Sequence, residues 1–277
     1  MVNLHEKARE IRKGILRTVY TQKQGHIGGP LSAADVLAVL YFDKMAVKPE
    51  EPEWTERDRF VLSKGHSAIA LYVTLALKGY FEYDELYTFD ALHSRLQAHP
   101  DMTKLPGIDM STGSLGQGIS AGVGMALAAK LQKKDYKTYV MLGDGESQEG
   151  QVWEAAAVAA RYNLSNLAVI VDNNGLQQYG WKEADSSERQ TPDVRFEEKW
   201  KAFGWKVLTV DGHQLDEIAE ALDAVNDKEN KQPVAIIAQT VKGKGISFME
   251  GQYEWHSKVP TESEFNKAMK ELGEVMP

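Results

Sequence analysis

The stretch 137–179 constrains the fold of this chain more than any other. A short apolar run ends in Gly-Asp-Gly at 143–145, an alanine-rich helical segment follows, and a second apolar run ends in Asp-Asn-Asn at 172–174. This order of strand, helix and strand predicts a βαβ unit whose two strands are parallel. Both polar clusters then lie at the carboxyl edge of the sheet, where open α/β sheets bind ligands. We therefore expect Asp144 and Asn174 to be neighbours in space.

The side chains at this predicted edge favour a metal ion together with a diphosphate. The Asp144 carboxylate, the Asn174 amide oxygen and nearby backbone carbonyls are hard oxygen donors, which Mg²⁺ binds octahedrally and shares with phosphates. Gly143 permits a tight turn, and Gly145 lets a diphosphate approach the backbone. The alternative for either half alone is structural, with Gly-Asp-Gly as a turn and Asn174 as a helix cap. Both halves on one βαβ unit favour the metal–diphosphate site.

The rest of the chain also alternates between strands and helices. Short strands are expected at 59–62, 205–210 and 234–239, and helices at 3–22, from Ser32 to about Met45, and at 68–78, 118–131, 193–203, 215–225 and 262–272. This order predicts an α/β fold with a doubly wound, mostly parallel sheet flanked by helices. We expect a single domain over 1–277 with a C-terminal helical tail at 257–277, a glycine-rich loop at 25–30 and an irregular loop at 175–192. Small residues on several faces of 118–131 predict a deeply buried helix, with a subunit contact as one explanation.

Composition excludes several classes of function. The formal net charge is −8 over 277 residues and no basic run is present, which argues against nucleic acid or an anionic membrane as a partner. The absence of cysteine excludes disulfides, thiolate nucleophiles and cysteine metal sites. No apolar run approaches the roughly 20 residues that span a bilayer, and the amphipathic beginning lacks the apolar core of a secretion signal. We therefore expect a cytoplasmic protein.

Other chemically active side chains gather at the same predicted edge. His66, His213 and Lys242 each lie just past a predicted strand. Four histidines stand in turn-like contexts, and imidazole suits proton transfer and hydrogen bonding to sugar hydroxyls near neutral pH. These four are His26, His66, His99 and His256. Their spacing does not resemble a zinc site. A lone loop histidine is more often a polar surface residue, and we interpret His213 as part of a turn and cap.

Three further features have both a functional and a structural interpretation. The Lys242-Gly-Lys-Gly segment is either a solvated basic turn or a diphosphate contact past a strand. Glu149 opens the central helix, where a carboxylate also complements the helix dipole. The glycines at 113–118 do not clearly follow a strand, and their order is wrong for a dinucleotide-binding loop. Local spacing leaves both interpretations open for Lys242 and Glu149.

Gly-Asp-Gly followed by Asn-Asn at 173–174 resembles the thiamine diphosphate fingerprint, and the longer run GDGESQEGQVWEAA at 143–156 resembles transketolases specifically. The similarity extends over essentially the whole chain, from GHIGGPLS to WHS, and covers the first, diphosphate-binding part of the family's usual chain. The resemblance implies the thiamine-diphosphate-binding fold, with thiamine diphosphate and Mg²⁺ (or Ca²⁺) as cofactors. It also implies transfer of a two-carbon ketol unit from a ketose phosphate to an aldose phosphate, as in the pentose phosphate pathway.

The resemblance also implies roles for individual residues. Asp144, Asn174 and the Leu176 backbone carbonyl resemble the metal ligands. Positions that match cofactor contacts are His66, Gly113, Ser114, Leu115, Asp144, Gly145, Asn174, Lys242 and His256. Residues that match the histidines of the substrate channel, which assist proton transfers, are His26, His66, His99 and His256. Glu149 matches a dimer-interface glutamate associated with communication between paired active sites.

In this family the cofactor lies between two domains, and the pyrimidine-binding domain supplies a glutamate that activates the aminopyrimidine ring. The residues after His256 are too few to encode that domain. We therefore expect the N-terminal subunit of a split transketolase, acting on sugar phosphates with a separate C-terminal, pyrimidine-domain subunit in a heterotetramer of two copies of each chain. The alternatives are an engineered fragment, a subunit of a deoxyxylulose-phosphate synthase-like or ketoacid dehydrogenase-like enzyme, and a non-catalytic cofactor-binding homologue.

Overall fold

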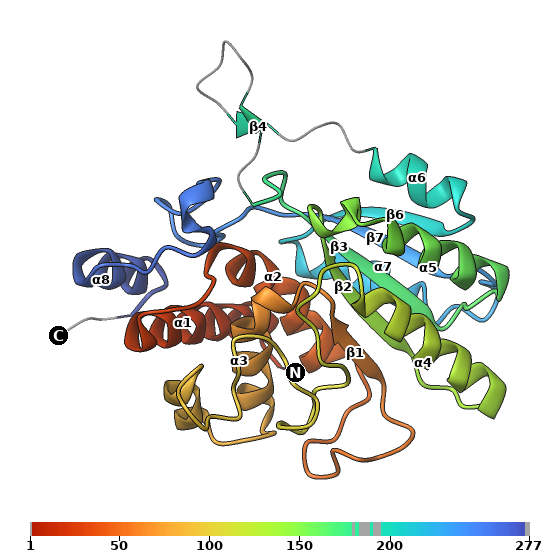
Figure 1. Cartoon of the computed structure of the whole chain (residues 1–277), viewed down its shortest axis with the longest axis horizontal. Coiled ribbons are helices and arrows are strands. Elements are labelled where there is room, and N and C mark those ends of the chain that lie inside the picture. Colours follow the sequence, from red (N-terminus) through yellow and green to blue (C-terminus); the bar gives the residue numbers. More distant parts are fainter. Residues whose placement is uncertain (1, 179–180, 183–188, 191–194, 275–277) are drawn as a thin grey trace.

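A five-stranded parallel sheet forms the centre of the protein (Figure 1). The computed structural model describes residues 2–178, 181–182, 189–190 and 195–274. In spatial order the strands are β1 (Arg59–Leu62), β2 (Thr138–Gly143), β3 (Leu167–Asn173), β7 (Val234–Gln239) and β6 (Lys206–Asp211). Because all five run in one direction, their carboxyl ends meet at one edge of the sheet, as the sequence predicts.

Each strand supplies side chains to two apolar cores, one on either face of the sheet. In β2, Tyr139 and Met141 belong to one core, whereas Val140 and Leu142 belong to the other. This division follows from the strand geometry, in which successive side chains point to opposite faces. In the inner strands β2, β3 and β7 both faces are buried, so their sequences are nearly continuous apolar runs. The edge strand β6 is mostly half-buried or exposed and includes Lys206, Thr209 and Asp211.

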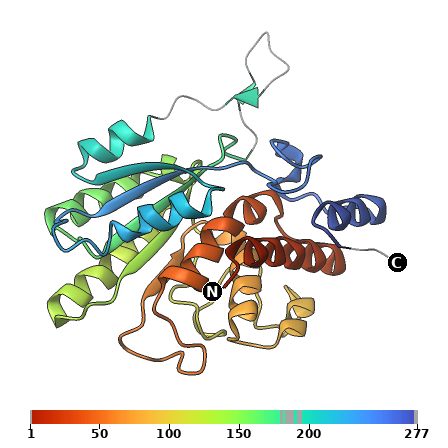
Figure 2. The ribbon, with the colours of Figure 1, turned by 180° about the vertical axis from the view of Figure 1, so that it is seen from behind.

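Helices cover both faces of the sheet (Figures 1 and 2). One face carries α4 (Gly118–Gln132), α5 (Gly150–Arg161) and α6 (Phe196–Ala202), and the other carries α1 (Leu4–Gln22), α2 (Gly28–Val39), α3 (Ala68–Lys78) and α7 (Leu215–Asp223). Short helical turns lie at η1 (Leu40–Lys44), η2 (Gly65–Ser67), η3 (Tyr83–Thr88), η4 (Glu146–Gln148) and η5 (Tyr253–His256). The last helix, α8 (Glu262–Glu271), lies against α1, where Phe265 stacks on Tyr20. This doubly wound arrangement confirms the predicted fold class.

The second helix begins earlier than predicted. It starts at Gly28 and not at Ser32, so the predicted loop at 25–30 ends before its last three residues. The first N–H groups of a helix need no intrahelical carbonyl, so Pro30, which has no N–H, fits within the first turn. All residues of α2 are buried, and the π-helical turn η1 then carries the helical segment to Lys44, close to the predicted end.

Within the described chain, helix α4 is buried on the side that faces the sheet and exposed on the opposite side, so the predicted deep burial is confirmed for one side, and a subunit contact on the other stays a prediction. A Cβ added at Gly122 would lie 2.3 Å from a methyl carbon of Val140, whereas a Cβ at Gly124 would meet nothing within 4 Å. Small residues are needed where the helix backbone approaches the sheet, and within the described part of the chain nothing covers the opposite side near Gly124.

The predicted irregular loop at 175–192 is only partly described. Residues 175–178 follow β3, and the short strands β4 (Trp181–Lys182) and β5 (Arg189–Gln190) form an antiparallel pair. That pair is a small correction to the prediction of irregular structure, and the remaining positions of the segment lie outside the described residues. The same holds for the end of the predicted tail, beyond residue 274.

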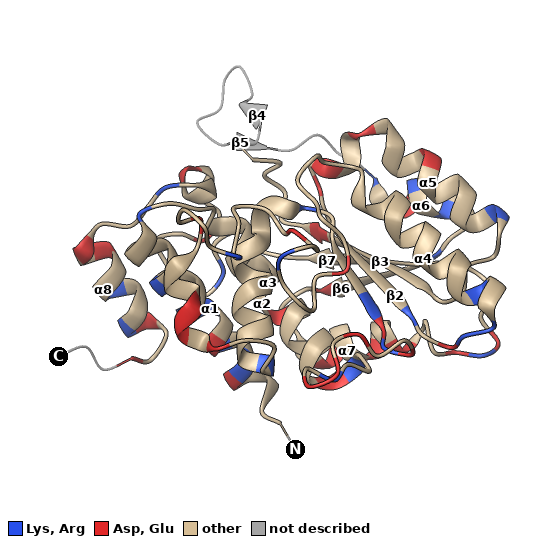
Figure 3. Cartoon of the chain, turned by 60° about the horizontal axis from the view of Figure 1, so that its bottom comes forward, with Lys and Arg blue, Asp and Glu red and all other residues tan. Residues whose placement is uncertain are grey.

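Acidic and basic residues are interspersed along α1 and α8, whereas the charged residues of α7 are all acidic (Figure 3). No extended basic face that would attract a polyanion is therefore seen on these helices. None of the helices described here combines the length and the apolar character that crossing a membrane requires.

Candidate active site

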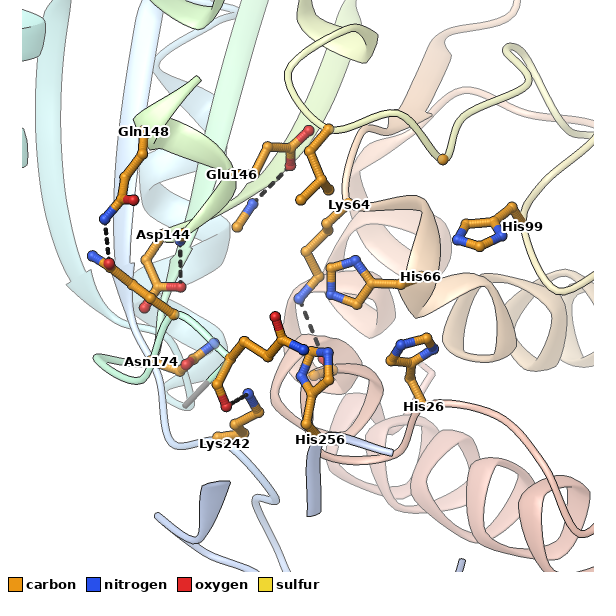
Figure 4. A pocket seen from close by; sticks show the side chains of 17 residues that line it. His26, Lys64, His66, His99, Asp144, Glu146, Gln148, Asn174, Lys242 and His256 are labelled. Carbon is orange, nitrogen blue, oxygen red and sulfur yellow. Dashed lines mark hydrogen bonds between the residues drawn. The ribbon is translucent and has the colours of Figure 1, made fainter. Parts of the chain in front are cut away.

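The carboxyl ends of the strands open into a cavity of about 380 Å³. Its lining comes from the loops after β1, β2, β3 and β7, from the start of α2, and from the segments around 99, 113–115 and 256. The lining residues are His26, Gly29, Lys64, His66, His99, Gly113, Leu115, Gly143, Asp144, Gly145, Glu146, Gln148, Asn174, Gln177, Gln178, Lys242 and His256. Figure 4 shows the carboxylate and amide groups at one end of the cavity and the histidines at the other.

Most of the residues that were assigned a site role from the sequence therefore meet in one cavity, but three of them do not line it. Ser114 is exposed in the loop between Gly113 and Leu115. Leu176 is buried beside the cavity, where its N–H donates to Asn174 Oδ1 at 3.3 Å. Glu149 is exposed at the N-cap of α5, and its side chain makes no capping hydrogen bond. His213 also lies outside the lining, which agrees with its interpretation as a turn residue.

Asp144 and Asn174 line the same end of the cavity, as predicted. The N–H of Gly145 donates to Asp144 Oδ1 at 2.7 Å, and the N–H of Gly175 donates to Oδ2 at 2.8 Å. Burial raises the pKa of Asp144, and the negative charge of Asp172 raises it further. A buried carboxylate in this setting gains stability when a cation enters the cavity. The end of the cavity at Asp144 and Asn174 therefore fits a hard divalent ion.

The composition of this donor set selects among metals. Among the described side chains, no group of three or more His, Asp or Glu could hold a metal ion. A zinc-type site is therefore not formed by these residues. Mg²⁺ instead combines one or two protein side chains with backbone, water and phosphate oxygens. Asp144, the Asn174 amide and a backbone carbonyl such as that of Leu176 suit such a mixed coordination.

Glu146 is a buried carboxylate whose structural role was not predicted from the sequence. Its Oε1 accepts hydrogen bonds from Ser63 Oγ at 2.5 Å and from the Gly116 N–H at 2.9 Å, and its Oε2 accepts from the Gly143 N–H at 3.0 Å. Burial raises the pKa of Glu146. These bonds connect the ends of β1 and β2 to the loop that carries Gly113. Its position directly after Gly-Asp-Gly was the only sequence signal.

Lys64 and Asp172 form a buried ion pair at the cavity. Lys64 Nζ also donates to the Gly29 carbonyl at 3.3 Å, while Ser32 Oγ donates to Asp172 Oδ2 at 2.7 Å and Thr240 Oγ1 donates to Oδ1. Burial alone would raise the pKa of Asp172, but the Lys64 charge and the hydrogen bonds bring it below its ordinary value. This network joins β1, α2, β3 and β7 beneath the cavity. The sequence signal for Lys64 was its place past a strand, two residues before His66.

Three histidines are packed together at the other end of the cavity. Ring centroids are 5.1 Å apart for His26 and His66, 4.9 Å for His26 and His256, and 5.5 Å for His66 and His256. Burial, with nearby positive charges, lowers the pKa of His66 to about 2 and of His256 to about 3, and it also lowers that of His26. These rings are therefore neutral near pH 7 and offer donor and acceptor nitrogens.

Several polar groups in the lining are left for a ligand. Lys242 is buried, its Nζ donates to the Gln178 carbonyl at 3.3 Å, and burial lowers its pKa to about 8. His256 Nδ1 and Gln177 Nε2 are buried atoms without a hydrogen-bond partner among the residues that the structure describes. Because buried polar atoms are normally hydrogen-bonded, these groups fit a polar, anionic ligand in the cavity.

Comparisons with known proteins agree with this geometry. Residues 5–275 match the family described as transketolase, thiamine diphosphate binding domain. The chain is 46% identical over 263 residues to one subunit of the apulose-4-phosphate transketolase from Phocaeicola vulgatus, covering 95% of this chain and 91% of the relative. It is 45% identical over 271 residues to the 6-deoxy-6-sulfo-D-fructose transketolase subunit SqwG from a Clostridium species, covering 98% and 96%. The solved transketolase from Campylobacter jejuni superimposes with a TM-score of 0.88 at 33% identity, and the match covers 99% of this chain but only 43% of that one.

Proposed function

Because the chain belongs to the family of transketolase thiamine diphosphate binding domains, we propose that it is the diphosphate- and Mg²⁺-binding subunit of a two-component transketolase. The observation that carries the proposal is the single cavity that holds Asp144 and Asn174 at one end and the neutral histidines at the other, with Lys242 in the same lining. A metal–diphosphate site next to neutral histidines, which can accept and donate protons, suits chemistry on a sugar phosphate.

The residues present fit the cofactor that the family name implies. Asp144, Asn174 and the Leu176 carbonyl would hold Mg²⁺, with Ca²⁺ as a substitute. Lys242 places a positive charge where a diphosphate would bind, and Gly145 offers close approach to the backbone. Further contacts to the cofactor come from Gly113, Ser114, Leu115, His66 and His256. When bound, thiamine diphosphate supplies the carbon nucleophile for transfer of a two-carbon ketol unit from a ketose phosphate to an aldose phosphate.

The histidines of this chain hold and move the protons of the sugar. A neutral ring at His26, His66 or His256 can accept a proton from a hydroxyl through one nitrogen and donate a hydrogen bond through the other. His99 lines the same end of the cavity. A sugar hydroxyl that loses its proton as a carbon–carbon bond breaks would therefore find a neutral acceptor close by. We assign Glu149, which is exposed at the start of α5, to a subunit interface in the assembly.

The partner in this proposal is a separate subunit that supplies the pyrimidine-binding domain. Two relatives that match over 91% and 96% of their own length are named as transketolase subunits, which supports a division of the enzyme between two chains. We propose a heterotetramer with two copies of each chain, in which the cavity described above is closed by the partner.

The test measures ketol transfer by the purified chain, by its partner and by their mixture. Xylulose 5-phosphate and ribose 5-phosphate serve as the first substrate pair, with apulose 4-phosphate and 6-deoxy-6-sulfofructose as further donors because the named relatives differ in substrate. We expect turnover from the mixture only, dependent on thiamine diphosphate and abolished by EDTA. Robust turnover by this chain alone would contradict the two-component proposal. Turnover of pyruvate in place of the ketoses would indicate a different thiamine diphosphate enzyme.

A further inference from the structure

A buried polar network lies beside the cavity and outside its lining. It joins Arg12 of α1, Asp35 of α2 and His213, which follows β6. Arg12 Nη1 donates to Asp35 Oδ1 at 3.1 Å, and His213 Nδ1 lies 2.7 Å from Asp35 Oδ2. The three side chains are 8–10% exposed. Burying charged groups costs desolvation free energy unless they are well paired. The network is therefore part of the folded structure and not an incidental surface contact.

The hydrogen bonds determine the state of the histidine. The backbone N–H of Val241 donates to His213 Nε2 at 2.8 Å. With Nε2 as the acceptor in this bond, Nδ1–H is the donor to Asp35. Burial alone would raise the pKa of Asp35, but the His213 hydrogen bond and the Arg12 charge bring it below its ordinary value. The Asp35 carboxylate thus sets both the tautomer of His213 and the direction of its acceptor nitrogen.

The segment held by this network is the loop after β7, which carries Lys242. The hydrogen bond from Val241 to His213 holds the residue before Lys242. On the other side, Arg12 Nε donates to the Lys244 carbonyl at 3.0 Å. The network therefore holds the backbone on both sides of Lys242. A Cβ added to Gly28, at the start of α2, would lie 2.9 Å from Lys242 Cγ. The Lys242 side chain therefore packs directly against the backbone at Gly28, and it lines the cavity.

From this geometry we propose that Arg12, Asp35 and His213 are positioning residues that place Lys242 in the cavity and thereby set the affinity for a diphosphate. None of the three lines the cavity, so they act on a ligand through the loop. A long lysine side chain on a mobile loop would lose conformational entropy when it engaged a ligand. Holding the loop before binding removes part of that cost. The proposal rests on the proposed function, because it takes the diphosphate of thiamine diphosphate as the ligand.

Two amide replacements of His213 each retain one of the two hydrogen bonds that its ring makes. Asn can offer an N–H near the Nδ1 position, toward Asp35, but has no atom at the Nε2 position. Gln can place its oxygen near Nε2 and retain the acceptor for Val241. Calorimetry in the presence of Mg²⁺, on the complex with the partner, should show that His213→Asn weakens thiamine diphosphate binding about tenfold, as expected for one lost hydrogen bond to a buried group. His213→Gln should stay within about threefold of the wild type.

A double-mutant cycle distinguishes positioning from a general loss of structure. If His213 acts through Lys242, the His213→Asn substitution should cause no further loss of affinity in a Lys242→Ala background. The same tenfold loss in both backgrounds, or no loss in either, would overturn the proposal. Arg12→Lys provides a second variant, because it keeps the charge beside Asp35 but removes the Nε donor to the Lys244 carbonyl. Its loss of affinity should likewise disappear in the Lys242→Ala background.

The wild-type complex provides the control that separates this proposal from the proposed function. If it binds neither thiamine diphosphate nor inorganic pyrophosphate in the presence of Mg²⁺, the proposed function is wrong, and the positioning role for a diphosphate falls with it. If the wild type binds both and His213→Asn binds equally well, only the positioning role is wrong. Thermal unfolding of each variant without ligand verifies that the compared proteins are folded.

Discussion

Replacing Lys64 by Met would leave the Asp172 carboxylate without its charged partner in the interior of the protein. The Lys64 side chain is 2% exposed and that of Asp172 is 0% exposed. Asp172 would keep the hydrogen bonds from Ser32 and Thr240 but lose the only positive charge paired with it among the described residues. Breaking a buried ion pair from one side costs about 3–5 kcal/mol. This is a large part of the about 5–15 kcal/mol by which typical domains are stable.

A second substitution separates the loss of charge balance from the loss of packing. In the double variant Lys64→Met/Asp172→Asn, neither position of the former ion pair is charged. The Asn side-chain oxygen can still accept a hydrogen bond from Ser32 or Thr240. Because uncharged replacements of buried ion pairs are often tolerated, we expect this double variant to be more stable than Lys64→Met alone by about 2 kcal/mol or more. Lys267→Met serves as a control, since Lys267 is 60% exposed and its removal should change stability by no more than about 0.5 kcal/mol.

Urea unfolding of the chain, followed by tryptophan fluorescence and circular dichroism, measures these differences. The folded chain holds the Asp172 pKa below its ordinary value, so the stabilisation by the ion pair is present above that ordinary pKa. It is lost as the pH falls through the lower folded-state pKa. A Lys64→Met variant within about 1 kcal/mol of the wild type at pH 7 would refute the estimate of the buried-pair energy. A double variant that is less stable than Lys64→Met would refute the assignment of the loss to an unpaired charge.

Three further predictions test other parts of the structure. The pKa of His66 is about 2 in the folded chain and about 6.5 in the unfolded chain. Below pH ~6.5 the unfolded chain therefore takes up a proton that the folded chain does not. The free energy of unfolding should fall there by about 1.4 kcal/mol per pH unit because of this residue. In unfolding titrations, His66→Gln should reduce this slope, and an unchanged slope would contradict the low pKa of His66. On α4, Gly122→Ala should lower the free energy of unfolding by about 1–3 kcal/mol, because the new Cβ would lie 2.3 Å from a methyl carbon of Val140. Gly124→Ala, whose Cβ would meet nothing within 4 Å, should raise it by up to about 1 kcal/mol. The opposite order of melting temperatures would contradict this packing of α4. Asp144→Ala should abolish Mg²⁺-dependent binding of thiamine diphosphate in the complex while the fold survives, and unchanged binding by calorimetry would argue against Asp144 as a metal ligand.

The fold class and the location of the cavity followed from local sequence patterns. The apolar runs before Gly143 and Asp172 predict two parallel strands, and in a parallel sheet every strand delivers its carboxyl end to the same edge. Asp144, Asn174, His66 and Lys242 could therefore be placed together from chain order alone. The packed histidines were predicted only in part. Their residue type and turn context indicated a site, but not the contacts between His26, His66 and His256.

Other features depended on side chains that come from distant parts of the chain. The partners of Lys64 and Glu146, and the contacts of Arg12 and Asp35 with the loop that carries Lys242, show no periodicity or spacing by which a sequence could reveal them. The outer side of α4 and the early start of α2 were also decided by what packs against them. A strand or helix is specified by the residues within it, and parallel pairing brings strand ends to a common edge. Which buried charge meets which partner depends on the distances between packed elements, and only the tertiary structure sets those distances.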